Sequence, residues 1–175
     1  MKIYLILIKN LVIKILPIVI SLLLYSCSTT PLNQGQENKS KHTTYLITPN
    51  SNVDKTVEKL IDLSSIRLKG YVVIIPVSMN KNDKKAAEYK NSFYRHDIMA
   101  VHIFNMNPNY LLKNTDKIMI ENAAIICFVG DRQSNREQFR KWAFRSGILA
   151  YLKKAVKNGT LIAGNKEIIK SLQLN

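Results

Sequence analysis

Two long apolar runs constrain the fold of this chain more than any other feature. "YVVIIPV" (71–77) and "AAIICFV" (123–129) carry apolar side chains at successive positions, as strands buried on both faces do. Around them, short apolar runs alternate with segments in which apolar residues recur at helical spacing. A parallel sheet with crossover helices has this alternation. We therefore predict an α/β fold with a doubly wound, mostly parallel sheet of about five strands.

Shorter segments complete the pattern. Further strands are expected at 43–48, 99–106 and 160–164, and helices at 51–65, 83–96, 115–122, 134–144 and 148–159. Ser51 stands three residues before Asp54 and is the expected start of the first helix. Ser134 and Glu137 have the spacing of a capping box, and Gly159 is typical of a helix end.

The N-terminal segment has a different character. Lys2, Lys9 and Lys14 precede or interrupt an apolar stretch, and the uninterrupted part (15–25) is shorter than the roughly 20 residues that span a bilayer. Cys27 follows, so the layout resembles a bacterial lipoprotein signal in which Cys27 is lipidated. An uncleaved anchor helix is the alternative. The predicted domains are a signal peptide at 1–26, a flexible tether at 27–42 and the α/β domain at 43–175.

The chain is strongly basic, with a formal net charge of +14, and removing the three lysines of the signal leaves +11. Such an excess favours anionic partners such as lipid head groups or envelope polymers. The basic residues are scattered and no nucleic-acid motif accompanies them, so no nucleic-acid partner is expected. With Cys27 lipidated, Cys127 is left alone in an apolar run and is expected to be a core residue.

The order of several segments resembles the cyanophycinase and peptidase S51 family, which has a class I glutamine amidotransferase-like, flavodoxin-like fold. The segments are "IIPVS", "IENAAIICFVGDRQ", a helix with a tryptophan, and "GILAYLKKAVKNGTLIAG". The resemblance covers about Thr43 to Gly164. The matching positions are Pro76, Ser78, Ala124, Ile126, Phe128, Gly130, Gln133, Gly159, Ile162 and Gly164.

The resemblance fails at the nucleophile. Lys166 falls on the position of the family's catalytic serine, and Glu167 and Ile168 replace the small residues that permit its strained turn. The family's histidine and acid come later than the last residue here, Asn175. The resemblance thus implies a degenerate domain that is incomplete at its C-terminus, with no catalytic residue assigned. A sheet that ends at its fifth strand would also expose apolar area, which predicts marginal stability or a partner over that edge.

A residual ligand or anion site is the remaining candidate. It comprises Gly130, Arg132, Gln133 and Gly164, because Arg132 and the following helix start could hold an anion. His42, His96 and His102 have no Cys, Asp or Glu at metal-ligand spacing, so no metal site and no cofactor are predicted.

Three functions remain open. The first is an exported, membrane-anchored lipoprotein with a degenerate S51-like domain, either catalytically inactive or a gene fragment. The second is an active serine-type peptidase whose triad is unrecognised or completed by a second chain. The third is a basic, membrane-tethered α/β module that binds anionic envelope polymers.

Overall fold

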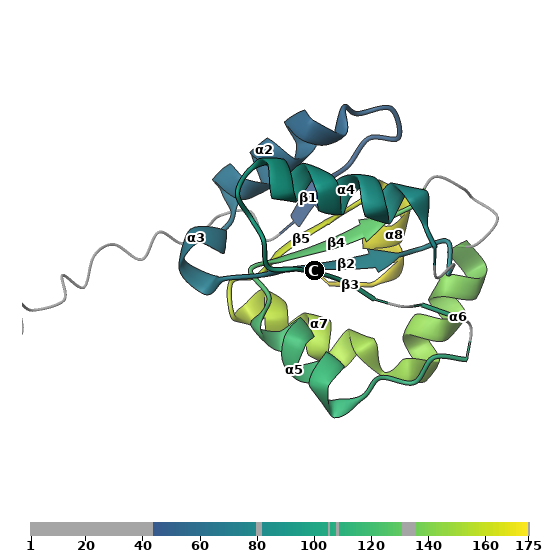
Figure 1. The fold of residues 1–175 in the computed structure, drawn as a ribbon. Coiled ribbons are helices and arrows are strands. Elements are labelled where there is room, and N and C mark those ends of the chain that lie inside the picture. Colours follow the sequence, from purple (N-terminus) through teal and green to yellow (C-terminus); the bar gives the residue numbers. More distant parts are fainter. Residues whose placement is uncertain (1–43, 80–81, 105, 108, 131–135, 175) are drawn as a thin grey trace, which may run out of the picture. The chain divides into compact units, whose positions relative to one another are not determined.

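The computed structural model describes residues 44–79, 82–104, 106–107, 109–130 and 136–174. They contain a five-stranded sheet with the order β1-β5-β4-β2-β3 in which every neighbouring pair is parallel (Figure 1). The strands are β1 (Thr44–Leu46), β2 (Val72–Pro76), β3 (Val101–Ile103), β4 (Ile125–Val129) and β5 (Leu161–Gly164). The predicted α/β fold with a doubly wound parallel sheet is confirmed.

Helices cover both faces of the sheet (Figure 1). One face packs against α2 (Val53–Leu63), α3 (Ile66–Lys69) and α4 (Lys84–Arg95). The other packs against α5 (Asn114–Asn122), α6 (Arg136–Ser146), α7 (Ile148–Lys157) and α8 (Lys166–Ser171). The four-residue helix α3 was not predicted.

The two apolar runs form the strands at the middle of the core. All residues of β2 and β4 are buried, and they alternate between the two hydrophobic layers. Val73 and Ile75 face α5–α8, whereas Cys127 faces α2–α4. Burial raises the pKa of the Cys127 thiol, so this cysteine is a neutral core residue, as expected.

The edges of the sheet are not where the sequence suggested. The last strand, β5, lies between β1 and β4, so the edge strands are β1 and β3, each three residues long. The expectation of an exposed fifth strand is therefore wrong, because β1 covers it in parallel register from Thr44↔Ile162 to Leu46↔Gly164. Leu46 on β1 remains 49% exposed.

The structure shows how α2 begins and how α7 ends. Asn52, not Ser51, caps α2, since its side chain accepts a hydrogen bond from the Lys55 amide. Ser51 instead donates to the Thr48 carbonyl. Gly159 ends α7 with a φ of 78°, as predicted. The Ser134 half of the expected capping box lies outside the described residues.

Within the described ranges, no helix is long and apolar enough to cross a membrane.

Candidate functional site

The strand order reverses between β2 and β4. The chain leaves β2 toward β3 on one side, and leaves β4 toward β5 on the other. In open α/β sheets, ligands bind at the carboxyl ends of strands near this point. The loops that follow β1, β2, β4 and β5 meet at this end of the sheet, because all the strands are parallel.

The backbone is tightly packed where β2 and β4 end. Gly130 has a φ of 155°, and a Cβ there would lie 3.1 Å from the Val77 Cβ and 3.4 Å from the Ser78 nitrogen. Met79, across from it, has a positive φ of 56°. The Ser78 hydroxyl donates to the Asp83 carboxylate, which also caps α4 by accepting the Ala86 amide. Glycine is favoured at 130 because its φ is one that other residues rarely adopt, and because a Cβ there would press against the loop after β2.

A small cleft of about 50 Å³ lies beside this contact, with space for about three or four water molecules. It opens between the ends of β1, β4 and β5 and the starts of α4 and α6. Its lining residues are Ile47, Thr48, Pro49, Ser51, Lys85, Tyr89, Phe128, Val129, Gly130, Arg136 and Asn165. Among the described residues, the lining of the cleft therefore has two cations, several neutral polar groups and no acidic residue.

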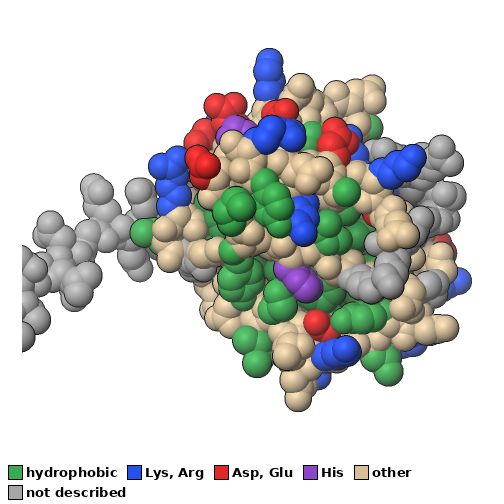
Figure 2. Space-filling model, viewed as in Figure 1, with side chains coloured by type: hydrophobic (Ala, Val, Ile, Leu, Met, Phe, Trp, Pro, Cys, Tyr) green, Lys and Arg blue, Asp and Glu red, His purple; other side chains and the backbone are tan. Residues whose placement is uncertain are grey.

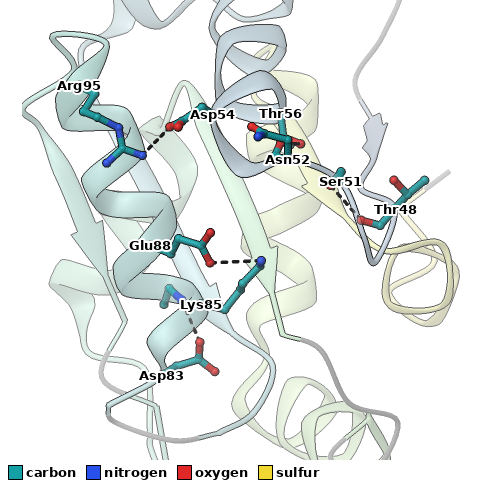
Figure 3. Close-up of polar contacts among 10 residues, drawn as sticks. Thr48, Ser51, Asn52, Asp54, Thr56, Asp83, Lys85, Glu88 and Arg95 are labelled. Carbon is teal, nitrogen blue, oxygen red and sulfur yellow. Dashed lines mark hydrogen bonds and ion pairs between the residues drawn. The ribbon is translucent and has the colours of Figure 1, made fainter.

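The polar groups of one wall are held by local contacts (Figure 3). Ser51 donates to the Thr48 carbonyl at 2.9 Å, and Lys85 pairs with Glu88 of the same helix at 3.2 Å. Tyr89 is 1% exposed, and its burial raises the pKa of its phenol. Hydrogen bonds with the side chains of Thr56 and Ser51 lower this pKa, but by less than burial raises it. The phenol thus remains a neutral hydroxyl.

Arg136 supplies the second cation and is the first residue of α6. Its Nε atom is buried and has no hydrogen-bond partner in the part of the chain that the structure describes. A buried donor without a partner costs about 1–3 kcal/mol, so this arrangement is unfavourable unless an acceptor occupies the cleft. The guanidinium is thus the group best suited to hold an anion.

The turn after β5 does not present a nucleophile. Asn165 accepts the Ile168 amide at 2.8 Å and caps α8, which begins at the exposed Lys166. Gly164 precedes this cap in close contact with β4, because a Cβ there would lie 3.1 Å from the Phe128 Cβ. The lysine therefore projects from the first turn of an ordinary capped helix.

Of the described serines that bond a carboxylate, Ser78 lies away from the described imidazoles, whereas Ser92 stands one helical turn before His96, whose charge also acts on Asp54, the partner of Ser92. His96 ends α4, and Asp83, the partner of Ser78, begins it; the 12 residues between span about 18 Å. His102 pairs in register with Val73, near the amino end of β2. Burial lowers the pKa of its imidazole, which packs edge-on to Phe104.

A second serine, Ser92, donates to Asp54 at 2.5 Å, and Arg95 pairs with the same carboxylate at 2.5 Å (Figure 3). Ser92 is 0% exposed and joins α4 to α2. It is out of reach of a substrate, and the contact is a structural link between two helices.

The predicted residual site is partly brought together. Gly130 lines the cleft and Gly164 directly precedes Asn165, which also lines it. Arg132 and Gln133, like the predicted lipidation site Cys27, lie outside the described residues. Sequence reasoning missed Lys85, Tyr89 and Arg136, although Arg136 stands in the same basic segment after β4 as Arg132. No group of three or more His, Cys, Asp or Glu side chains that could hold a metal occurs in the described ranges.

No family model matches the chain, and neither the curated proteins nor the solved structures contain a match to it.

Proposed function

We propose that the protein is an exported lipoprotein whose peptidase S51-like domain lacks hydrolase activity and keeps a cleft that binds a small anion. The observation that carries this proposal is the turn after β5, where Asn165 caps a helix and Lys166 is its first residue. A hydrolase of this resemblance needs a hydroxyl on a strained turn at that place. A solvent-exposed lysine lacks the desolvating pocket that would activate its amine.

The composition of the cleft supports the binding half of the proposal. Arg136 and Lys85 bring positive charge, while Thr48, Ser51 and Asn165 bring neutral polar groups. Lys85 shares its charge with Glu88, whereas Arg136 has a buried Nε donor without a partner among the described residues, so Arg136 is the stronger candidate to bind the anion. A volume of about 50 Å³ suits a group such as a phosphate, a sulfate or a carboxylate.

Hydrolysis is tested with β-aspartyl dipeptides and a serine-directed fluorophosphonate probe. The purified chain is expected to release no product and to take up no probe. Covalent labelling of a serine would overturn the proposal and favour the active peptidase. If labelling occurred only after a second polypeptide was added, the completed-triad alternative would hold.

Anion binding is tested by titrating inorganic phosphate and following the melting temperature. A ligand that binds only the folded state stabilises it by about 2.7 kcal/mol at one hundred times its dissociation constant. The expected signature is a saturating rise in melting temperature, whereas a linear rise equal to that caused by other excluded salts would show no site.

The lipoprotein assignment is tested by Cys27→Ala. The wild-type chain is expected in the membrane fraction with the added mass of a lipid on Cys27, and the variant without that mass. An unmodified Cys27 in the wild-type chain would refute the assignment.

A second candidate, a basic tethered module for anionic envelope polymers, is favoured by the net charge of +11 that remains without the signal. It predicts polymer binding that weakens steeply with salt, because exposed charges are screened beyond about 8–10 Å near physiological ionic strength. Polymer binding that Arg136→Met leaves unchanged would assign this activity to the surface and not to the cleft.

A further inference from the structure

Positive charge is concentrated on α6 and α7. These two helices carry seven cations, Arg136, Arg140, Lys141, Arg145, Lys153, Lys154 and Lys157, against one acid, Glu137, which gives +6. On the other face of the sheet, α2 carries −1, α3 +2 and α4 +3, which gives +4 for the three helices. Figure 2 shows acidic and basic side chains mixed over α2 and α4. The surface of α6 and α7 is thus basic, and we refer to it as the basic side.

An exposed phenylalanine lies within this basic side. Phe144 is 81% exposed, although full burial of such a side chain is worth about 1.5–3 kcal/mol. It lies one helical turn from Arg140 and Lys141, whose side chains are 65% and 75% exposed. Glu137, two turns away, faces both cations at 3.5 Å and 3.8 Å, but such exposed pairs contribute little.

A hollow of about 480 Å³ adjoins Phe144. Its apolar wall comes from Ala143, Phe144 and Leu149, with Leu172 after α8 at its floor, and Arg140 and Lys141 form its charged rim. Apolar surface next to a cationic rim matches a layer in which anionic head groups lie above acyl chains. The remaining lining residues are Ser171, Gln173 and one acid, Glu137, which pairs with Arg140 and Lys141, so the charged rim carries two cations and one acid.

We propose that the exposed face of α6, formed by Arg140, Lys141, Phe144 and Arg145, docks on an anionic lipid bilayer. Phe144 enters the interface between head groups and acyl chains, and the three cations contact lipid phosphates. The inference rests on the proposed membrane anchor for proximity to the bilayer, but not for the contact itself. In this arrangement the lipid at Cys27 holds the domain at the membrane and α6 sets its orientation.

The test places a tryptophan at the contact. Full-length Phe144→Trp protein is reconstituted into vesicles of phosphatidylcholine with or without phosphatidylglycerol, using brominated acyl chains as quencher. Wild-type protein, whose Trp142 is 1% exposed, gives the baseline to subtract. The added tryptophan is expected to shift to the blue and to be quenched only when phosphatidylglycerol is present. Arg140→Gln with Lys141→Gln should weaken the contact about fivefold per cation removed, raising the phosphatidylglycerol fraction needed for half-maximal quenching.

Met99→Trp is the matched control. Met99 is 70% exposed and apolar but stands near Asp97, outside the basic side. Quenching at 144 but not at 99 supports the inference. Equal quenching at positions 144 and 99 overturns the α6 contact. So does an absence of quenching at 144 in protein that sediments with vesicles. Both results leave the proposed lipid anchor in place. Quenching that a soluble anionic polymer abolishes would identify a polymer surface instead. Quenching at 144 that persists in Cys27→Ala retains the α6 contact and shows that it does not depend on the lipid anchor.

Discussion

Replacing Arg136 with methionine is expected to stabilise the folded protein while removing its response to anions. Methionine keeps the unbranched apolar stem but lacks the buried Nε donor, which has no partner among the described residues. An unsatisfied buried donor costs about 1–3 kcal/mol, and because Arg136 as a whole is partly exposed, the lower end applies. A gain of about 1 kcal/mol corresponds to a rise in melting temperature of roughly 3–5 °C for a domain of this size.

Circular dichroism melts with and without phosphate measure both effects. Wild-type protein should gain a saturating stabilisation from phosphate, and Arg136→Met should begin higher and show only the small linear effect of an excluded salt. Arg140→Met is the matched control, because Arg140 lies on the same helix with its side chain 65% exposed. It should change stability by less than about 0.5 kcal/mol and leave the phosphate response intact.

Two results would refute this reasoning. If Arg136→Met lowered the melting temperature, the guanidinium would be making favourable contacts in the folded state. If the variant kept the saturating phosphate response, the anion would bind elsewhere.

Three further substitutions test contacts that hold the strands and helices together. Thr160→Val removes a fully buried hydroxyl that donates to the Ala123 carbonyl at 2.6 Å. The free energy of unfolding measured in urea should fall by about 1–3 kcal/mol. A loss smaller than that caused by Thr160→Ser would argue against the hydrogen bond. Gly164→Ala places a Cβ 3.1 Å from the Phe128 Cβ and should destabilise by about 1–3 kcal/mol; a neutral result would show that β4 and α8 can move apart. The pKa of Asp54 is lowered from 3.8, first by the hydrogen bond from Ser92 and then by that from Arg95. The ionised carboxylate therefore stabilises the folded state above pH 3.8, and this stabilisation is lost as the pH falls through the lowered pKa. Asp54→Asn should flatten the decline of the urea midpoint below pH 4, and an unchanged decline would contradict the link.

The sequence predicted the fold well where side chains determine it locally. Runs 71–77 and 123–129 are apolar at successive positions, and this pattern has few solutions other than an interior strand of a parallel sheet. The position of β1 could not be read in this way. Its pairing with β5 joins the two ends of the domain, and no local pattern in "TTYLIT" encodes so distant a neighbour. The predicted edge was wrong for the same reason.

The candidate site was harder to predict because its residues have ordinary local roles. Lys85 lies in the first turn of α4, Tyr89 belongs to the buried stripe of that helix, and Arg136 begins α6. Only the convergence of strand ends brings the three side chains together. The assignment of Lys166 to a nucleophile position remains a prediction from resemblance, and the structure adds that this lysine begins a capped helix.

The adjacency of β1 and β5 also bears on the order in which the protein is made. During synthesis β1 emerges first, yet the strand it joins is complete only after Leu161 to Gly164 have left the ribosome. Until then its amide and carbonyl groups have no native strand to pair with, and closing so long a loop slows assembly. A nascent chain built this way cannot complete its sheet until nearly the whole domain has been translated.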